Sequence, residues 1–179
     1  MASKNPIRIA ITGPESTGKS LLCEQLASYF GEPWVKEYAR EYLENLGTNY
    51  SFGDILSIAH GQFEKEKEAL LVSKQYLFCD TDFLVTHIWS LVKFGKTHKW
   101  ITEMATSHAY DYTLLCNIDL PWEYDPLREN KNNRQQLFDM FIDELALRNI
   151  KYSVVSGLGI DRFNNAIEIL EVNGIIKSK

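Results

Sequence analysis

Cysteine is scarce in this sequence, and the few cysteines are scattered. Cys23, Cys79 and Cys116 stand far apart, without the spacing of a zinc site or a CxxC redox pair, so we expect buried thiols in a reducing compartment. The chain also lacks an apolar run as long as a membrane span, and its first residues lack the apolar stretch of a signal peptide. These absences predict a cytoplasmic protein with no membrane partner.

An excess of basic residues is also missing. The sequence holds 19 lysines and arginines against 24 aspartates and glutamates, which gives a formal net charge of −5. This balance predicts no nucleic-acid partner, because nucleic-acid binders present a basic footprint. The composition is otherwise ordinary: 45% of the 179 residues are hydrophobic, enough to bury a core, and we expect residues 1–179 to form a single domain.

Apolar strand-like runs alternate with helical patterns along the chain, which predicts βαβ units and a parallel sheet. The apolar and β-branched runs predict strands at residues 7–12, 34–36, 76–79, 112–116 and 152–155. Apolar residues at helical spacing predict helices at residues 19–30, 51–70, 83–94, 100–108, 134–149 and 160–172. Ser51 and Asp54 form a capping-box-like pair at the start of the second of these helices.

One short motif carries the strongest chemical signal. The stretch GPESTGKS, from Gly13 to Ser20, fits GxxxxGK[ST] and lies between a predicted strand and a predicted helix. Such a loop points backbone N–H groups at phosphate oxygens, its lysine reaches the β- and γ-phosphates, and its serine hydroxyl binds Mg²⁺. The residues expected around the phosphates are Gly13, Glu15, Ser16, Thr17, Gly18, Lys19, Ser20 and Leu21.

The motif and the strand pattern together predict the fold. We expect a three-layer α/β P-loop NTPase fold, with a parallel five-stranded sheet in the order 2-3-1-4-5 and helices on both faces. The polar residues 118–133 should form a short lid. The carboxyl ends of the parallel strands should carry the remaining catalytic groups.

Two aspartates follow the third predicted strand. Asp80 comes directly after an apolar strand, a Walker-B-like arrangement that predicts a role at Mg²⁺ together with Ser20. Asp82 stands two residues later and is predicted to contact the substrate. The alternative for this pair is capping of the helix that follows.

A second group of polar residues follows the second predicted strand. Glu37 could accept the proton of an acceptor hydroxyl, and Arg40 could bind a phosphate or the acceptor. Tyr38, between them, is counted with them as a substrate contact. The alternative is a surface turn that leads into a helix.

The predicted lid contributes cations and an aromatic ring. Arg128 and Arg134 flank a polar stretch, and their guanidinium groups could stabilise the charge of a transferring phosphate; an exposed, solvated loop is the alternative. Trp122, in the lid, and Trp89, in a predicted helix, are candidates for stacking on a flat substrate, although a tryptophan on a helix is often core.

These motifs resemble, in order, those of the ribosylnicotinamide kinase domain of the NadR family. The resemblance rests on GPESTGKS, EYAREYL from Glu37, the DTD from Asp80, and the PW and LRE stretches between Pro121 and Glu129, and it spans about residues 7–170. It implies transfer of the γ-phosphate of ATP to the 5′-hydroxyl of nicotinamide riboside, which gives nicotinamide mononucleotide.

The resemblance also implies roles for individual residues. Glu37, Arg40, Asp80 and Asp82 should line the acceptor site, Trp89 and Trp122 should bracket the nicotinamide ring, and Gly157 and Arg162 should lie on the adenine side. The catalytic groups are then Lys19, Glu37, Asp80 and Arg128, with Arg134 at the ATP phosphates. NadR also carries a nucleotidyltransferase domain with paired histidines, whereas His60, His87, His98 and His108 form no such pair, so we expect a stand-alone kinase.

Two other functions fit parts of the sequence. One is a P-loop kinase for another nucleoside or small hydroxyl compound, since the same scaffold serves many acceptors. The other is a nucleotide-dependent switch, but a guanine switch needs an Asn-Lys-x-Asp motif and residues 130–133 read Asn-Lys-Asn-Asn. The oligomeric state is left open.

Overall fold

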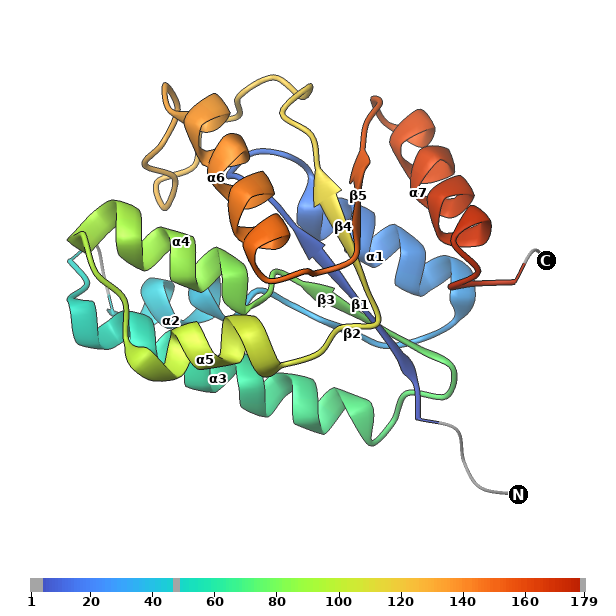
Figure 1. The fold of residues 1–179 in the computed structure, drawn as a ribbon, viewed down its shortest axis with the longest axis horizontal. Helices are drawn as coiled ribbons and strands as arrows, with labels where there is room; N and C mark the ends of the chain where they lie inside the picture. Colours follow the sequence, from blue (N-terminus) through green and yellow to red (C-terminus); the bar gives the residue numbers. More distant parts are fainter. Residues whose placement is uncertain (1–4, 47–48, 178–179) are drawn as a thin grey trace.

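The computed structural model describes residues 5–46 and 49–177, which form a central sheet with helices around it (Figure 1). The strands are β1 (Ile7–Thr12), β2 (Trp34–Val35), β3 (Tyr76–Asp80), β4 (Tyr112–Cys116) and β5 (Tyr152–Val155). The helices are α1 (Lys19–Phe30), α2 (Tyr38–Leu46), α3 (Phe52–Leu70), α4 (Phe83–Phe94), α5 (Lys99–Ser107), α6 (Arg134–Leu147) and α7 (Ile160–Val172).

All five strands are parallel, in the order β2-β3-β1-β4-β5, as predicted. β1, β3 and β4 form the centre, and both β3 and β4 are buried along their whole length. A strand covered on both faces reads as a continuous apolar run, which is why these segments were recognisable in the sequence. Because the strands are parallel, their carboxyl ends lie along one edge of the sheet.

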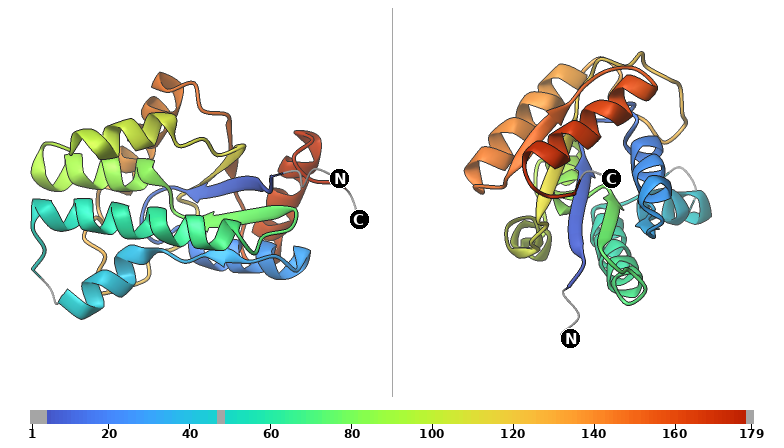
Figure 2. Two further views of the ribbon diagram at one scale, coloured as in Figure 1. Left: turned by 90° about the horizontal axis from the view of Figure 1, so that it is seen from below. Right: turned by 90° about the vertical axis from the view of Figure 1, so that its right-hand side faces the viewer.

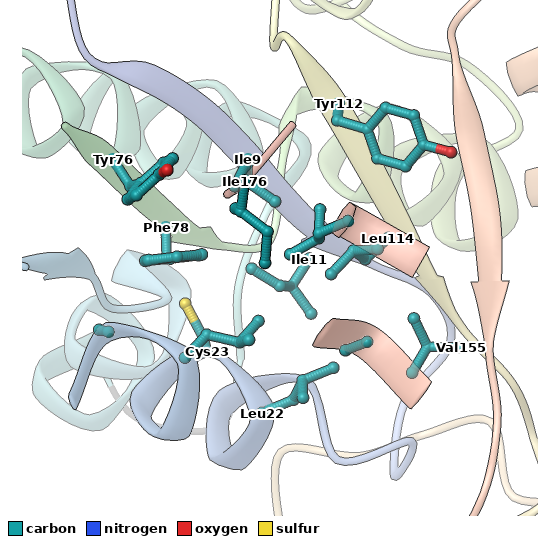
Figure 3. Close-up of a cluster of buried hydrophobic side chains, with 14 of the residues drawn as sticks. Ile9, Ile11, Leu22, Cys23, Tyr76, Phe78, Tyr112, Leu114, Val155 and Ile176 are labelled. Atoms are coloured by element: carbon teal, nitrogen blue, oxygen red, sulfur yellow. The ribbon is translucent and has the colours of Figure 1, made fainter. Parts of the chain in front are cut away.

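Helices cover both faces of the sheet, and alternate strand residues point to the two layers. On one face, Ile9, Ile11 and Leu114 pack with Leu22 and Cys23 of α1 (Figure 3), and α7 completes this layer. On the other face, residues of α4 and α6 pack around Leu115, and the end of α3 packs beside Leu77. The strands lie between these two layers of helices, and Figure 2 shows them from two further sides.

The predicted elements are confirmed apart from their ends and one omission. α3 begins at a capping box in which Ser51 and Asp54 bond each other as predicted. β2 is one residue shorter than predicted, and α6 is two residues shorter. Helix α2 was expected only in the alternative interpretation of residues 37–40, as the helix after a surface turn, and Leu43 is its single buried residue. None of the described helices is long and apolar enough to span a membrane.

Candidate active site

A cavity of about 540 Å³ opens at the carboxyl edge of the sheet. Its wall on the nucleotide side is the phosphate loop, Gly13 to Ser20, which follows β1. The opposite wall, here called the acceptor wall, consists of Glu37, Ala39, Arg40 and Leu43 at α2 and Val85, Ile88, Trp89 and Val92 in α4. Lid residues, among them Arg128, close the third side. The volume is typical of a pocket for a small organic ligand.

The phosphate loop has the backbone that phosphate binding requires. Gly13 and Gly18 have φ angles of 133° and 74°, which favour glycine, and a Cβ on Gly13 would lie 2.9 Å from the carbonyl oxygen of Cys116. Gly18 is the N-cap of α1 and offers no side-chain cap, so the first N–H groups of the helix are available to an anion. Thr17 Oγ1 and Lys19 Nζ each donate to the carbonyl oxygen of Pro14 over 2.8 Å.

Asp80 ends β3 beneath this loop and is 2% exposed. Burial, and to a smaller extent the nearby carboxylate of Glu37, raise its pKa to about 6, although a hydrogen bond from Ser20 and the charge of Lys19 act against this. Its Oδ1 is buried and has no hydrogen-bond partner among the described residues. A buried carboxylate oxygen without a donor, beside the Ser20 hydroxyl, fits a cation that also binds the phosphates of a nucleotide.

Asp82 has a different setting, although it stands only two residues further. Its Oδ1 accepts hydrogen bonds from Thr12 Oγ1 and from the backbone N–H of Val85, both over 2.9 Å. It is the N-cap of α4, and burial raises its pKa to about 6. Asp82 is not among the residues that line the cavity. The structure therefore has Asp82 in the capping arrangement that was the alternative to a substrate contact.

The acceptor wall brings together residues from α2, α4 and the lid. Glu37 and Arg40 line the cavity, and Arg40 forms an ion pair of 2.8 Å with Asp125 of the lid. Trp89 also lines it, with its indole N–H donating over 2.9 Å to the hydroxyl of Tyr50. Tyr38 is not part of the lining, because its ring lies against α3 instead.

The lid is bonded to the phosphate loop at two loop residues. The Glu15 carboxylate accepts from the backbone N–H groups of Glu129 and Asn130, over 3.0 and 2.9 Å. Ser16 Oγ accepts from the N–H of Glu123 over 2.9 Å, and Arg134 donates to the carbonyl oxygen of Ser16 over 3.0 Å. Arg134 thus bonds the backbone of the loop and does not line the cavity.

Of the two remaining lid residues predicted to serve the site, one lines the cavity and the other does not. Arg128 lines the cavity and donates to the carbonyl oxygen of Glu123 over 2.6 Å. Trp122 is half-buried and is not among the lining residues. Of the two predicted stacking residues, only Trp89 therefore faces the cavity in this structure.

The predicted adenine side is a closed hydrogen-bond cluster. Arg162 is 4% exposed, pairs with Asp119 and donates to the carbonyl oxygens of Val155 and Gly157. The backbone N–H of Gly157 donates over 2.7 Å to the same Asp119 carboxylate. Arg162 borders the cavity, so this cluster shapes the rim of the nucleotide side.

Residues 8–162 match a family model described as an AAA domain. The chain belongs to this AAA domain family. The match covers the phosphate loop, the acceptor wall and the lid, so every part of the cavity described above lies inside the family's domain.

Two curated relatives of this chain are both NadR proteins. It is 27% identical over 172 residues to the trifunctional NAD biosynthesis/regulator protein NadR of Salmonella typhimurium and 27% identical over 171 residues to that of Escherichia coli. These alignments cover 91% and 90% of the chain but only 42% and 41% of the relatives. The chain therefore spans about two fifths of the length of either NadR protein, and the predicted resemblance to NadR is confirmed over that part.

Solved structures with the same fold include a NadR protein and a thymidylate kinase. A NadR protein in complex with NR has a TM-score of 0.82 at 19% identity, covering 98% of the chain and 53% of that protein. Thymidylate kinase from Ehrlichia chaffeensis has a TM-score of 0.69 at 17% identity, covering 95% and 100%. These likenesses confirm the predicted fold.

Several residues of the site were missed in the sequence. Asp119 organises the rim, Asp125 pairs with Arg40, and Tyr50 bonds Trp89. Each acts through a partner between 38 and 85 residues away in the chain. Neighbouring sequence carries no signal of such pairs, whereas the contiguous phosphate loop was fully recognisable.

Proposed function

We propose that this chain transfers the γ-phosphate of ATP to the 5′-hydroxyl of nicotinamide riboside and so makes nicotinamide mononucleotide. The observation that carries the proposal is the shared cavity, in which the phosphate loop faces a wall with Glu37, Arg40 and Trp89. A nucleotide on the loop and a nucleoside on this wall would meet inside one cavity. The similarity to NadR proteins over nine tenths of the chain supports this choice of acceptor.

The chemistry of the acceptor wall suits a cationic nucleoside. A nicotinamide ring attached to ribose is a pyridinium cation, which favours an aromatic face and nearby carboxylates. Trp89 supplies such a face and Glu37 supplies negative charge in the cavity lining, whereas the buried Asp80 lies beside Ser20 and is not itself a lining residue. A neutral nucleoside would gain less from the same groups.

Catalysis of phosphoryl transfer depends mainly on positioning of the reactants and neutralisation of charge. In this proposal Lys19 contacts the β- and γ-phosphates, Arg128 approaches the transferring group from the lid, and Glu37 accepts the proton of the 5′-hydroxyl. Ser20 and Asp80 would hold Mg²⁺, which would neutralise negative charge on the phosphates. The unpartnered oxygen of Asp80 supports that assignment.

The proposal is tested by an ADP-release assay with ATP, Mg²⁺ and a panel of nucleosides that includes nicotinamide riboside. We expect nicotinamide riboside to have the highest kcat/KM of the panel and the product to be nicotinamide mononucleotide by mass spectrometry. A higher kcat/KM with thymidine, deoxyadenosine or another nucleoside would show that this nucleoside, and not nicotinamide riboside, is the preferred acceptor. ADP release that no acceptor accelerates would refute the proposed kinase.

A further inference from the structure

Helix α2 presents two different faces at the site. Ala39, Arg40 and Leu43 line the cavity, whereas Tyr38 and Tyr42, four residues apart, lie on the face toward α3. Tyr42 donates its hydroxyl hydrogen to Asp54 of α3 over 2.7 Å. The acceptor wall is therefore held from behind by α3, a helix that contributes no residue to the cavity lining.

One close contact between these helices involves Gly61 of α3. A Cβ built on Gly61 would lie 1.9 Å from Cε1 and 2.2 Å from Cδ1 of Tyr38, where ordinary contact begins at 3.4 Å. The Tyr38 ring therefore rests on the glycine backbone, and any side chain at position 61 would displace it by about 1.5 Å or more. The helical backbone at Gly61 does not itself require glycine, since its φ is not positive.

The next residue of α3 holds the same point of the chain through a hydrogen bond. Gln62 is 3% exposed, and its Oε1 accepts from the backbone N–H of Tyr38 over 2.9 Å. This N–H is the first of α2 and has no partner within its own helix, so the Gln62 side chain caps α2 from a distance. Tyr38 is thus fixed at both its ring and its backbone.

The residue before Tyr38 is the one that faces the reaction. Glu37 lines the cavity, and its backbone N–H and its carboxylate both act on Asp80, the buried carboxylate beneath the phosphate loop. A shift of the Tyr38 backbone, which the ring contact with Gly61 and the Gln62 hydrogen bond both restrain, would pass through one peptide bond to Glu37. Small misplacements of this kind cost roughly a hundredfold in rate when they affect a reacting group.

We propose that Gly61 and Gln62 are positioning residues that set Glu37 against the phosphate loop by fixing the ring and the backbone N–H of Tyr38. This inference rests on the proposed kinase function in requiring an acceptor, but not on which nucleoside that acceptor is. Neither residue touches the cavity, so both act through Tyr38 and Glu37.

The test compares two glycine-to-alanine variants of the same helix. Gly61→Ala should lower kcat for the best acceptor by roughly ten- to a hundredfold, with the Kd for ATP close to wild type. Gly53→Ala is the matched control, because a Cβ there would lie 3.7 Å from its nearest neighbour, Ser51 Oγ. Equal kcat values for the two variants would overturn the inference.

A double-mutant cycle separates positioning from a general effect on the fold. In a Tyr38→Ala background the ring is gone, so adding Gly61→Ala should lower kcat no further. A loss of the same size in both backgrounds would overturn the inference. If Gly61→Ala alone does not fold, Gln62→Leu takes its place: a fall in kcat with unchanged ATP binding supports positioning, and an unchanged kcat refutes it.

The cycle is measured with whichever nucleoside the wild type phosphorylates fastest. If nicotinamide riboside is not that nucleoside, the proposed acceptor fails while the cycle still reports on positioning. If nicotinamide riboside is the best acceptor and the cycle shows no coupling, the positioning inference alone fails.

Discussion

The two walls of the cavity are built by different means. The phosphate loop is one contiguous stretch, from Gly13 to Ser20, and its shape follows from backbone angles and from the start of α1. The acceptor wall takes residues from α2 and α4, and its α2 part is held by α3 and by the lid. The proposed triphosphate site is therefore local in the sequence, whereas the proposed acceptor site is distributed over several elements. Substitutions outside the phosphate loop can then change the acceptor and leave the nucleotide site intact.

The largest loss of kcat should come from a substitution in the phosphate loop. Lys19→Ala should lower kcat by about a thousandfold, because it removes the cation expected at the β- and γ-phosphates. The melting temperature should stay near that of the wild type, since Lys19 is not part of the buried core. Steady-state kinetics and thermal unfolding check this, with Lys74→Ala, an exposed lysine before β3, as the control. Wild-type turnover in Lys19→Ala would contradict the assignment of the loop.

Asp80 and Asp82, at the end of β3, should differ in their effect on kcat. Asp80→Asn should lower kcat by about a hundredfold, because Asp80 lies beside Ser20 with an unpartnered oxygen. Asp82→Asn should leave kcat within about threefold, because asparagine also caps helices well. A large loss of kcat in Asp82→Asn would instead support the prediction that Asp82 contacts the substrate.

Both aspartates should affect stability in the same direction when no ligand is bound. Each has a folded pKa of about 6, above the ordinary value near 4, so each favours the folded state most below about pH 4. That contribution is lost as the pH rises through 6. At pH 7 either asparagine variant should therefore raise the free energy of unfolding by about 1–3 kcal/mol. Urea unfolding at pH 4 and pH 7 measures this, and a gain of equal size at both pH values would contradict the raised pKa.

The tryptophans test which aromatic ring serves the acceptor wall. Trp89→Ala should raise the KM for the nucleoside by about tenfold and leave the Kd for ATP unchanged, because Trp89 lines the cavity. Trp122→Ala should raise the nucleoside KM less, because Trp122 is not part of the lining. A larger effect at Trp122 would indicate that the lid rearranges when the nucleoside binds.

The smallest effect is expected at the link between the acceptor wall and the lid. The Arg40–Asp125 pair is partly solvated, with 44% and 16% of the two side chains exposed. Such a pair contributes about 0–1 kcal/mol, so Asp125→Asn should raise the nucleoside KM by about two- to threefold, less at high salt. Glu103→Gln removes a remote exposed pair with Lys99 and should change nothing.

Much of the fold was predictable because its signals are local. The strands that are buried on both faces read as apolar runs, and the capping box at Ser51 marked the start of α3. Helix α2 was foreseen only as the alternative to a substrate site, and its contacts are made by tyrosines and a single buried leucine. Asp82 shows the limit of adjacency: an Asp before a helix can cap it or serve a site, and only its bonds to Thr12 and Val85 distinguish these.

The sequence by itself determined the phosphate loop, the elements of the parallel sheet and the edge at which the site lies. These follow from glycine positions, apolar runs and the geometry of parallel strands, all of which are encoded by neighbouring residues. Only the tertiary structure decided which residues of the acceptor wall face the cavity. Glu37 and Tyr38 are adjacent in the chain, yet one lines the cavity and the other rests on Gly61. The reason is that docking of α2 on α3 selects the face, and that docking depends on residues more than 20 positions away.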